Sequence, residues 1–235
     1  MTWSILARDA QTGALGAAVT TRFFAVGAIC PMLRSGVGAV CSQALVNPLW
    51  RGAALDRLAA GQGPDDAIAA LVAADAGAGM RQLHVMAADG RSARHTGDRC
   101  TSYAGHLAGA DVSVAGNMLV GPDVLAATLA AFQAASGLPL AARMLAALEA
   151  GEAAGGDKRG RQSAALVVMG AADETAEIDL RVDDHPDPLA ELRRLYAVAQ
   201  RRFVPFRRHM ATADGPGTLE RRIIEADIAA TEAAA

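Results

Sequence analysis

The pattern of apolar and polar positions divides the chain into blocks of short strands. Short runs rich in small apolar residues and bounded by Gly, Pro, Asn or Asp are typical of β-strands. Such runs occupy residues 2–8, 14–22, 26–30, 37–45, 80–88, 91–96, 103–108, 111–120, 163–169 and 176–182. The first two runs are joined by a turn-rich segment, so the chain is predicted to begin with a β-hairpin.

Helical spacing of apolar residues appears in pairs of segments between these strand blocks. Helices are expected at residues 48–60, 64–72, 124–132, 140–150, 187–196 and 218–232. This order does not fit the strict alternation of strand and helix in a Rossmann fold or a (β/α)8 barrel. It predicts an α+β fold, a four-layer αββα sandwich in which two antiparallel sheets stack and helices cover each outer face.

The domain boundary is expected near the C-terminus. Residues 1–204 are predicted to form the αββα domain. Gly and Pro interrupt the chain at residues 214–217, and residues 205–235 are predicted to form a peripheral helical tail. The sequence contains no tandem repeat.

Charge and hydropathy exclude two classes of partner. Lys and Arg total 22 against 25 for Asp and Glu, which leaves a net charge of -3 without a basic block. Nucleic acid is therefore not expected as a partner. No apolar run reaches the roughly 18 residues that a membrane-spanning helix needs. The N-terminus also lacks the regions of a signal peptide, so a cytoplasmic protein is expected.

Cysteine, histidine and glycine patterns indicate no metal or cofactor. Cys30, Cys41 and Cys100 are not spaced as a zinc site or redox pair, and we expect reduced, mostly buried thiols. His185 follows two adjacent acids, which cannot both face one ion from a strand. A structural role in a turn is therefore favoured for His185. The glycine motifs of dinucleotide and phosphate sites are absent, so no cofactor is expected.

Thr2 is the first candidate for catalysis. Methionine aminopeptidase removes an initiator Met that precedes a small residue, and Thr qualifies. Thr2 would then carry a hydroxyl nucleophile and an α-amine whose pKa, near 7.7–8.0, suits a general base at neutral pH. The alternative is that Met-Thr opens this chain by chance, as it does in many cytoplasmic proteins.

Six segments of the chain carry a resemblance to a known family. They are residues 1–9, 21–27, 43–48, 116–119, 155–163 and 183–188. Together they resemble an uncharacterised bacterial family of the N-terminal-nucleophile (Ntn) hydrolase superfamily, over roughly residues 1–200. In Ntn hydrolases the nucleophile opens the first strand of a hairpin. The resemblance therefore implies an amide hydrolase with Thr2 as nucleophile.

A more distant similarity links residues 20–22 to the element beside the nucleophile of proteasome β-type subunits. Thr20 replaces the acid of that element, whereas Arg22 persists. The lysine of those subunits has no counterpart, because Lys158 is the only lysine. Arg22 is permanently cationic and can stabilise an anion but cannot relay a proton. The alternative is a charge at the surface end of a strand.

The resemblance implies roles for two later segments. Asn117 ends a strand, and its amide or a neighbouring N–H is a candidate oxyanion donor; the alternative is a turn-capping Asn. Asp157 and Ser163 are predicted to orient the α-amine of Thr2. We also predict that three neighbours in this segment bind a substrate carboxylate or amide: Arg159, Arg161 and Gln162. A solvated polar loop is the competing interpretation.

The remaining candidates line the predicted pocket: Thr20, Thr21, Gln43 and Asn47. Two functions stay open on this sequence. The first is hydrolysis of the C–N bond of a small-molecule or peptide amide. The second is an Ntn-like fold that binds a small metabolite or acts as an oligomeric scaffold without catalysis, which the missing acid and lysine favour. In both cases a homo-oligomer is expected, with a dimer as the default.

Overall fold

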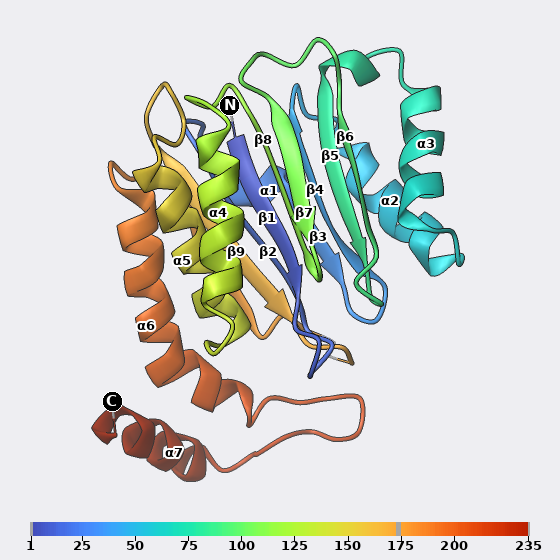
Figure 1. Cartoon of the computed structure of the whole chain (residues 1–235). Helices are drawn as coiled ribbons and strands as arrows, with labels where there is room; N and C mark the ends of the chain where they lie inside the picture. The colour runs from blue at the N-terminus through green and yellow to red at the C-terminus, as the bar shows by residue number, and fades with distance from the viewer. Residues whose placement is uncertain (1, 173–174, 235) are drawn as a thin grey trace.

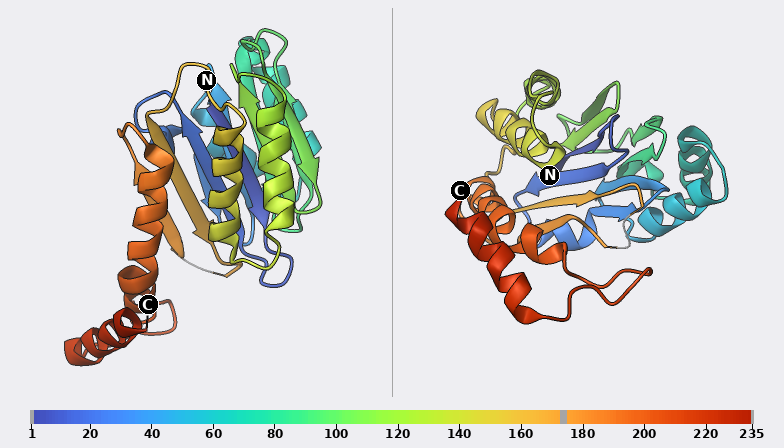
Figure 2. Two further views of the ribbon diagram at one scale, coloured as in Figure 1. Left: turned by 60° about the vertical axis from the view of Figure 1, so that its left-hand side comes forward. Right: turned by 90° about the horizontal axis from the view of Figure 1, so that it is seen from below.

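The computed structural model describes residues 2–172 and 175–234 of the chain. Two antiparallel sheets lie face to face at its centre, and helices cover the outer face of each (Figures 1 and 2). The prediction of an α+β fold with two antiparallel sheets in a four-layer αββα arrangement is confirmed.

The larger sheet has six strands in the order β10-β9-β2-β1-β8-β7. Their bounds are β1 Thr2–Arg8, β2 Leu15–Thr21, β7 Gly105–Gly109, β8 Val112–Asn117, β9 Ser163–Met169 and β10 Ile178–Val182. The predicted opening hairpin is present, since β1 and β2 pair antiparallel. Because β1 also pairs with β8, the start of the chain lies at the centre of this sheet.

The smaller sheet has the strand order β3-β4-β5-β6. Its strands are β3 Pro31–Arg34, β4 Gly38–Ala44, β5 Arg81–Ala87 and β6 Ser92–Thr96, and the 3₁₀ turn η1 (Ala78–Met80) leads into β5. Helices α2 (Leu49–Ala59) and α3 (Pro64–Ala74) cover its outer face. Trp50 and Leu55 of α2 are buried there against Leu83 and Val85 of β5.

Three helices cover the outer face of the larger sheet: α4 (Asp123–Ala134), α5 (Leu140–Ala153) and α6 (Pro188–Arg207). The helix α5 lies close to β2, because a Cβ added at Gly16 would collide with the sulfur of Met144. Glycine in a strand often marks such a close approach. The small strand residues therefore let α5 lie close against the sheet.

Strand alternation separates two apolar layers around β1. Trp3 and Ile5 point toward α4 and α5, whereas Leu6 points toward the smaller sheet. Leu6 is buried there with Cys41 and Met86. The side chains of even-numbered residues in β1 therefore enter the space between the two sheets.

The prediction of a strand at residues 26–30 is wrong. This segment forms the short helix α1 (Val26–Ile29), and a strand that the pattern did not predict, β3, follows it. Ala25 turns the chain with a left-handed φ of 53°, and the Cys30 N–H closes one helical turn on the Val26 carbonyl. A short apolar run does not distinguish a buried helical turn from a strand.

The C-terminal helix α7 (Arg221–Ala233) extends beyond the two-sheet body (Figures 1 and 2). None of its residues is buried, and it contacts α6 through the ion pairs Arg202–Glu232 and Arg208–Asp227. The helix α6 runs without interruption through the position where the tail was predicted to begin. Among the described residues, no helix combines the length and apolarity that crossing a membrane requires.

Candidate functional site

Thr2 lies at the N-terminal end of the central strand β1. Its neighbour across the sheet on one side is Asn117 of β8, and on the other side its hydroxyl donates a hydrogen bond to the Thr21 hydroxyl of β2, at 3.1 Å. Like Ser4 and Leu6, it faces the space between the sheets. Thr2 is only 8% exposed, yet its side chain reaches a pocket. A mostly buried hydroxyl is thus presented to a cavity.

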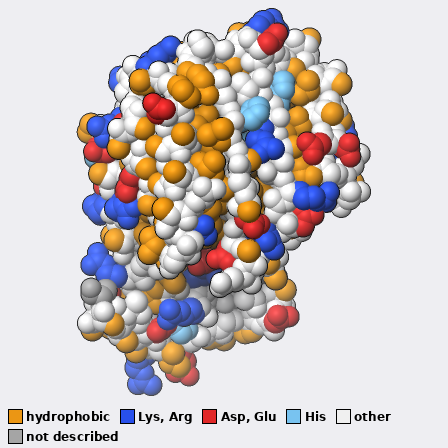
Figure 3. Space-filling view, viewed as in Figure 1, with side chains coloured by type: hydrophobic (Ala, Val, Ile, Leu, Met, Phe, Trp, Pro, Cys, Tyr) orange, Lys and Arg blue, Asp and Glu red, His pale blue; other side chains and the backbone are white. Residues whose placement is uncertain are grey.

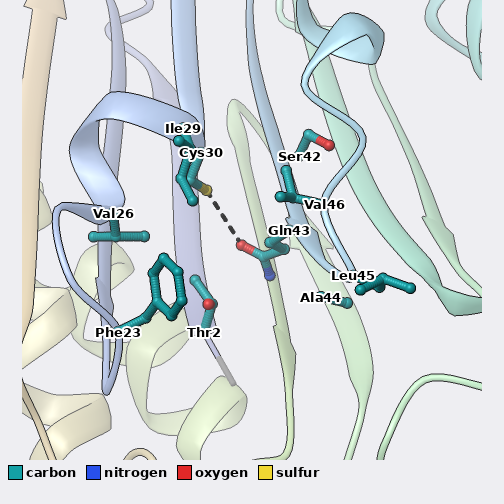
Figure 4. A pocket seen from close by; sticks show the side chains of 10 residues that line it. All are labelled: Thr2, Phe23, Val26, Ile29, Cys30, Ser42, Gln43, Ala44, Leu45 and Val46. Carbon is teal, nitrogen blue, oxygen red and sulfur yellow. Dashed lines mark hydrogen bonds between the residues drawn. The ribbon is translucent and has the colours of Figure 1, made fainter.

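The pocket beside Thr2 has a volume of about 230 Å³. Its lining is mainly apolar and comes from α1, the end of β4 and the loops around them (Figure 4). The lining residues are Thr2, Phe23, Val26, Ile29, Cys30, Ser42, Gln43, Ala44, Leu45 and Val46. Phe23 and Leu45 are exposed, whereas Cys30 and Gln43 are buried. The pocket therefore has a hydrophobic mouth and a partly polar interior.

Left-handed backbone conformations surround this end of the sheet. Ala25, Ala44 and Met118 have φ values of 53°, 67° and 54°. Each costs free energy for a residue with a Cβ, and such residues cluster at functional sites. Ala25 and Ala44 lie on the two sides of the pocket, and Met118 follows the partner of Thr2 on β8. Their positions mark the Thr2 end of the sandwich as a candidate site.

The predicted residues Asp157 and Ser163 hold the chain that forms one wall of the pocket. The Asp157 carboxylate is buried and accepts hydrogen bonds from the N–H groups of Arg22 and Arg159, at 2.9 and 2.7 Å. It also pairs with the Arg159 guanidinium, at 3.2 Å. The Ser163 hydroxyl donates to the Phe23 carbonyl and accepts from the Val26 N–H. Both side chains therefore position the turn after β2.

Asn117 and Gln43 are brought together by a residue that the sequence did not point to, Gln82. Its side-chain oxygen accepts hydrogen bonds from the Gln43 and Asn117 amides, at 2.8 and 3.0 Å. The other Asn117 amide hydrogen points to the Thr2 carbonyl, at 3.5 Å. Gln82 is fully buried in β5. The signal that could have identified it is a Gln placed two residues before His84 in a strand, so that both polar side chains lie on one face.

The other predicted site residues lie around this centre at different distances from Thr2. Thr20 faces the helices, and its hydroxyl donates to the Ser163 carbonyl. Asn47 donates to the Asp75 carboxylate and accepts from the Leu49 N–H, at the start of α2. Thr20 and Asn47 therefore stabilise the backbone and side chains around them. Thr21 is instead hydrogen-bonded to Thr2, and Gln43 lines the Thr2 pocket.

A shallow polar groove lies next to the end of β2. It is lined by Arg22, Gly160, Arg161, Gln162, Asp184, His185 and Pro186. Arg161 forms ion pairs with Glu152 and Asp187, and Gln162 donates to Asp184. The Arg22 guanidinium contacts the Arg159 carbonyl at 3.4 Å. His185 bonds the Asp187 backbone within a turn. Among the residues described, no group of three or more His, Cys, Asp or Glu is arranged to hold a metal ion.

Comparison with known proteins identifies the family. A family model described as a family of unknown function, DUF1028, matches residues 2–192. The crystal structure of a DUF1028 protein from Silicibacter pomeroyi is 37% identical, with a TM-score of 0.79 over 85% of this chain and 89% of that chain. The chain belongs to the DUF1028 family. The DUF1028 match includes Thr2, the pocket and the Asp157 segment, and it ends within α6.

A second structure is similar at a much lower level. Anbu, described as an ancestral beta-subunit, from Yersinia bercovieri is 12% identical, with a TM-score of 0.42 over 84% of this chain and 94% of that chain. The search of curated proteins gives no match. The function of this DUF1028 chain therefore has to be inferred from its own residues.

Proposed function

We propose that this chain is an Ntn amide hydrolase whose nucleophile is the Thr2 hydroxyl after removal of Met1. The observation that carries the proposal is the position of Thr2. It is the first residue of the central strand, its hydroxyl is held by Thr21 at 3.1 Å, and it lines the apolar pocket. One residue then supplies both the nucleophile and, through its α-amine, the base.

The proposed reaction has two steps. The Thr2 hydroxyl attacks the amide carbon while its proton passes to the α-amine through a water molecule. The tetrahedral intermediate collapses, the C–N bond breaks, and the leaving amine takes the proton. Water then attacks the ester on Thr2, which releases a carboxylic acid and restores the hydroxyl.

The oxyanion of the intermediate needs hydrogen-bond donors. Both amide hydrogens of Asn117 are directed at Gln82 and the Thr2 carbonyl, so we assign the Asn117 side chain to positioning Thr2. Val46 lines the pocket, and its N–H has no hydrogen-bond partner among the residues described. We therefore assign the Val46 N–H as an oxyanion donor. Asp157 and Ser163 act by holding the wall that contains Phe23 and Val26.

The lining of the pocket indicates the substrate class. Val26, Ile29, Leu45 and Val46 offer apolar surface next to Thr2, and burial of apolar surface favours binding. We therefore propose a small-molecule or peptide amide that places an apolar group in this pocket. The Arg22 guanidinium lies in the adjoining groove and is assigned to a polar or anionic part of the substrate.

A second candidate function is a non-catalytic Ntn-like fold that binds a small metabolite. The surroundings of the Thr2 side chain favour it. The only lysine, Lys158, bonds the Ser102 carbonyl rather than Thr2, and among the described residues no carboxylate is hydrogen-bonded to the Thr2 side chain. The nucleophile would then depend on its own α-amine as the base. Removal of Met1 decides whether that amine is available.

The intact mass of protein produced without an N-terminal tag tests the proposal. The hydrolase requires that the mass lack one methionine, and that sequencing begin at Thr2. A Thr2→Lys variant is the matched control, because a large second residue blocks removal of the methionine. Wild-type protein that retains Met1 and still hydrolyses amides would overturn the assignment of Thr2.

A further inference from the structure

Two cysteines lie near one another between the sheets. Cys30 directly precedes β3, and the register pairs the next residue, Pro31, with Cys41 of β4. Cys30 is thus one residue out of register with Cys41, and both are buried in the same inter-sheet cluster. The Cys30 carbonyl accepts a hydrogen bond from the N–H of Ser42, the residue after Cys41, so the two cysteines lie on adjacent backbone segments. The third cysteine, Cys100, is separate and bonds the Arg81 carbonyl.

One sulfur of this pair is reachable from the pocket beside Thr2. Cys30 lines that pocket, and its thiol contacts the Gln43 side-chain oxygen at 3.6 Å (Figure 4). A small reactant that enters the pocket therefore meets Cys30 first. Cys41 lies in the same buried cluster as Cys30.

The surroundings of Cys41 favour its thiolate. Burial raises the pKa of the Cys41 thiol, but the neighbouring Cys30, His84 and Ser4 side chains outweigh burial and lower the pKa below its usual value. His84 is opposite Cys41 in the sheet, and both of its ring nitrogens contact serine hydroxyls, those of Ser4 at 2.8 Å and Ser113 at 3.0 Å. Burial raises the pKa of Cys30. A thiolate and a neighbouring thiol are the two partners that disulfide formation needs.

We propose that Cys30 and Cys41 form a reversible dithiol–disulfide site that small hydroperoxides oxidise through the pocket. One sulfur, as its thiolate, attacks the outer peroxide oxygen, which breaks the O–O bond and releases an alcohol, or water from hydrogen peroxide. The resulting sulfenic acid is attacked by the second sulfur, which forms the S–S bond and releases water. The two thiols lose two electrons and two protons, and the peroxide takes up both.

Oxidation would change the part of the pocket lined by Cys30 and Gln43. A disulfide brings the sulfurs to about 2.05 Å, so the Cys30 sulfur moves toward Cys41 and no longer donates to Gln43. Gln43 then keeps its hydrogen bond from Ser4, at 2.7 Å, but the pocket gains space at Cys30. This inference depends on the thiols and the pocket, and it does not require Thr2 to be catalytic.

Peptide mapping of the wild-type protein tests the site. Trypsin cleaves after Arg22, Arg34 and Arg51, which places Cys30 in peptide 23–34 and Cys41 in peptide 35–51. Folded protein is treated with hydrogen peroxide, quenched, alkylated in denaturant and digested without reductant. We expect the two peptides joined, with a mass two hydrogen atoms below their sum, and separated by dithiothreitol.

Two variants and one treatment serve as controls. Cys100→Ser should form the same linked peptide, and Cys30→Ser should not. Separately alkylated peptides 23–34 and 35–51 after peroxide treatment, with only Cys100 oxidised, would overturn the proposal. A link that forms only when the peroxide is added in urea would also overturn it, because the folded geometry would then play no part. The peptide map of the wild-type protein tests the proposal even where a serine variant does not fold.

Discussion

Gln82 joins the residues around Thr2 through one oxygen atom, which accepts hydrogen bonds from both Gln43 and Asn117. Its own amide nitrogen, which carries two hydrogens, lies within hydrogen-bond distance of three acceptors, the Gly105 and Gly116 carbonyls and the Thr96 hydroxyl, at 3.0, 2.8 and 2.9 Å. The side chain thus connects β5 and β6 of the smaller sheet with β7 and β8 of the larger one. Its loss would leave buried amides without partners.

We expect Gln82→Leu to destabilise the fold. Each buried polar group left unpaired costs on the order of 1–3 kcal/mol. Urea unfolding measures the difference from wild type. Gln133→Leu is the matched control, because Gln133 is exposed on α4 and its replacement should change stability by less than about 0.5 kcal/mol. Equal stability of the two variants would show that the Gln82 network contributes nothing.

Residue patterns anticipated part of this site. Thr2 and Thr21 are hydrogen-bonded, because a hairpin that begins at residue 2 places the ends of its strands together. Gln82 was missed because its contacts depend on how the second sheet stacks on the first. Local sequence does not encode that stacking, so a distant strand could not be assigned to the site.

The Asp75 carboxylate connects the start of α2 with β5, because it bonds both Asn47 and Arg81. Hydrogen bonds from Asn47 and the Gly77 N–H hold the pKa of the Asp75 carboxyl below its usual value, and Arg81 adds to this. A lowered pKa in the folded state means that the stabilisation is present above the unfolded pKa, about 3.9, and is lost as pH falls through the folded pKa.

Asp75→Asn should therefore lower the urea midpoint at pH 7, and the difference from wild type should shrink toward pH 3. The exposed Asp214→Asn is the control and should show no such pH-dependent difference. A difference for Asp75→Asn that stays constant from pH 7 to pH 3 would contradict the role of the carboxylate charge.

Among the elements, α6 and α7 contribute unequally to the fold. Leu189 and Leu192 of α6 are buried against the larger sheet, and Arg207 donates to the Ala176 carbonyl. The helix α7 has no buried residue. Stability should therefore depend on the last turn of α6 and very little on α7.

Two truncations test this difference. A chain that ends at Met210 should keep the thermal midpoint of the full chain within a few degrees. A chain that ends at Val204 removes the buried Pro205 and the Arg207 contacts, and its midpoint should fall. Circular dichroism during heating measures both. A large loss from the longer truncated chain would contradict the peripheral position of α7.

Most elements followed from apolar periodicity because long amphipathic segments carry a strong signal. The exception at residues 26–30 has a physical cause. Val26 is anchored by the Ser163 hydroxyl, from a strand that lies more than a hundred residues later in the chain. A tertiary hydrogen bond thus holds a helical turn where local composition favours a strand.

At the scale of the whole molecule, exposed apolar side chains point to self-association. Phe23, Phe24 and Leu49 are 55%, 60% and 77% exposed. On the face in Figure 3, further apolar side chains gather over α4 and its surroundings. Such surface is typical of interfaces between subunits.

We therefore expect a homo-oligomer, with a dimer as the default. Light scattering coupled to size exclusion at micromolar concentration measures the mass. The predicted mass is at least twice that of the 24.0 kDa chain, and equals twice that mass for a dimer. A mass of one chain across the concentration range would contradict this expectation.

The proposed hydrolase depends above all on the Thr2 hydroxyl as its nucleophile. A β-lactone probe tests it most directly, because attack by a hydroxyl opens the lactone and leaves an ester on the attacking residue. We expect a single adduct on Thr2 in wild-type protein and in Cys30→Ser, retention of the adduct in Thr2→Ser, and its loss in Thr2→Ala. An adduct on Cys30, or labelling that is unchanged in Thr2→Ala, would contradict the account.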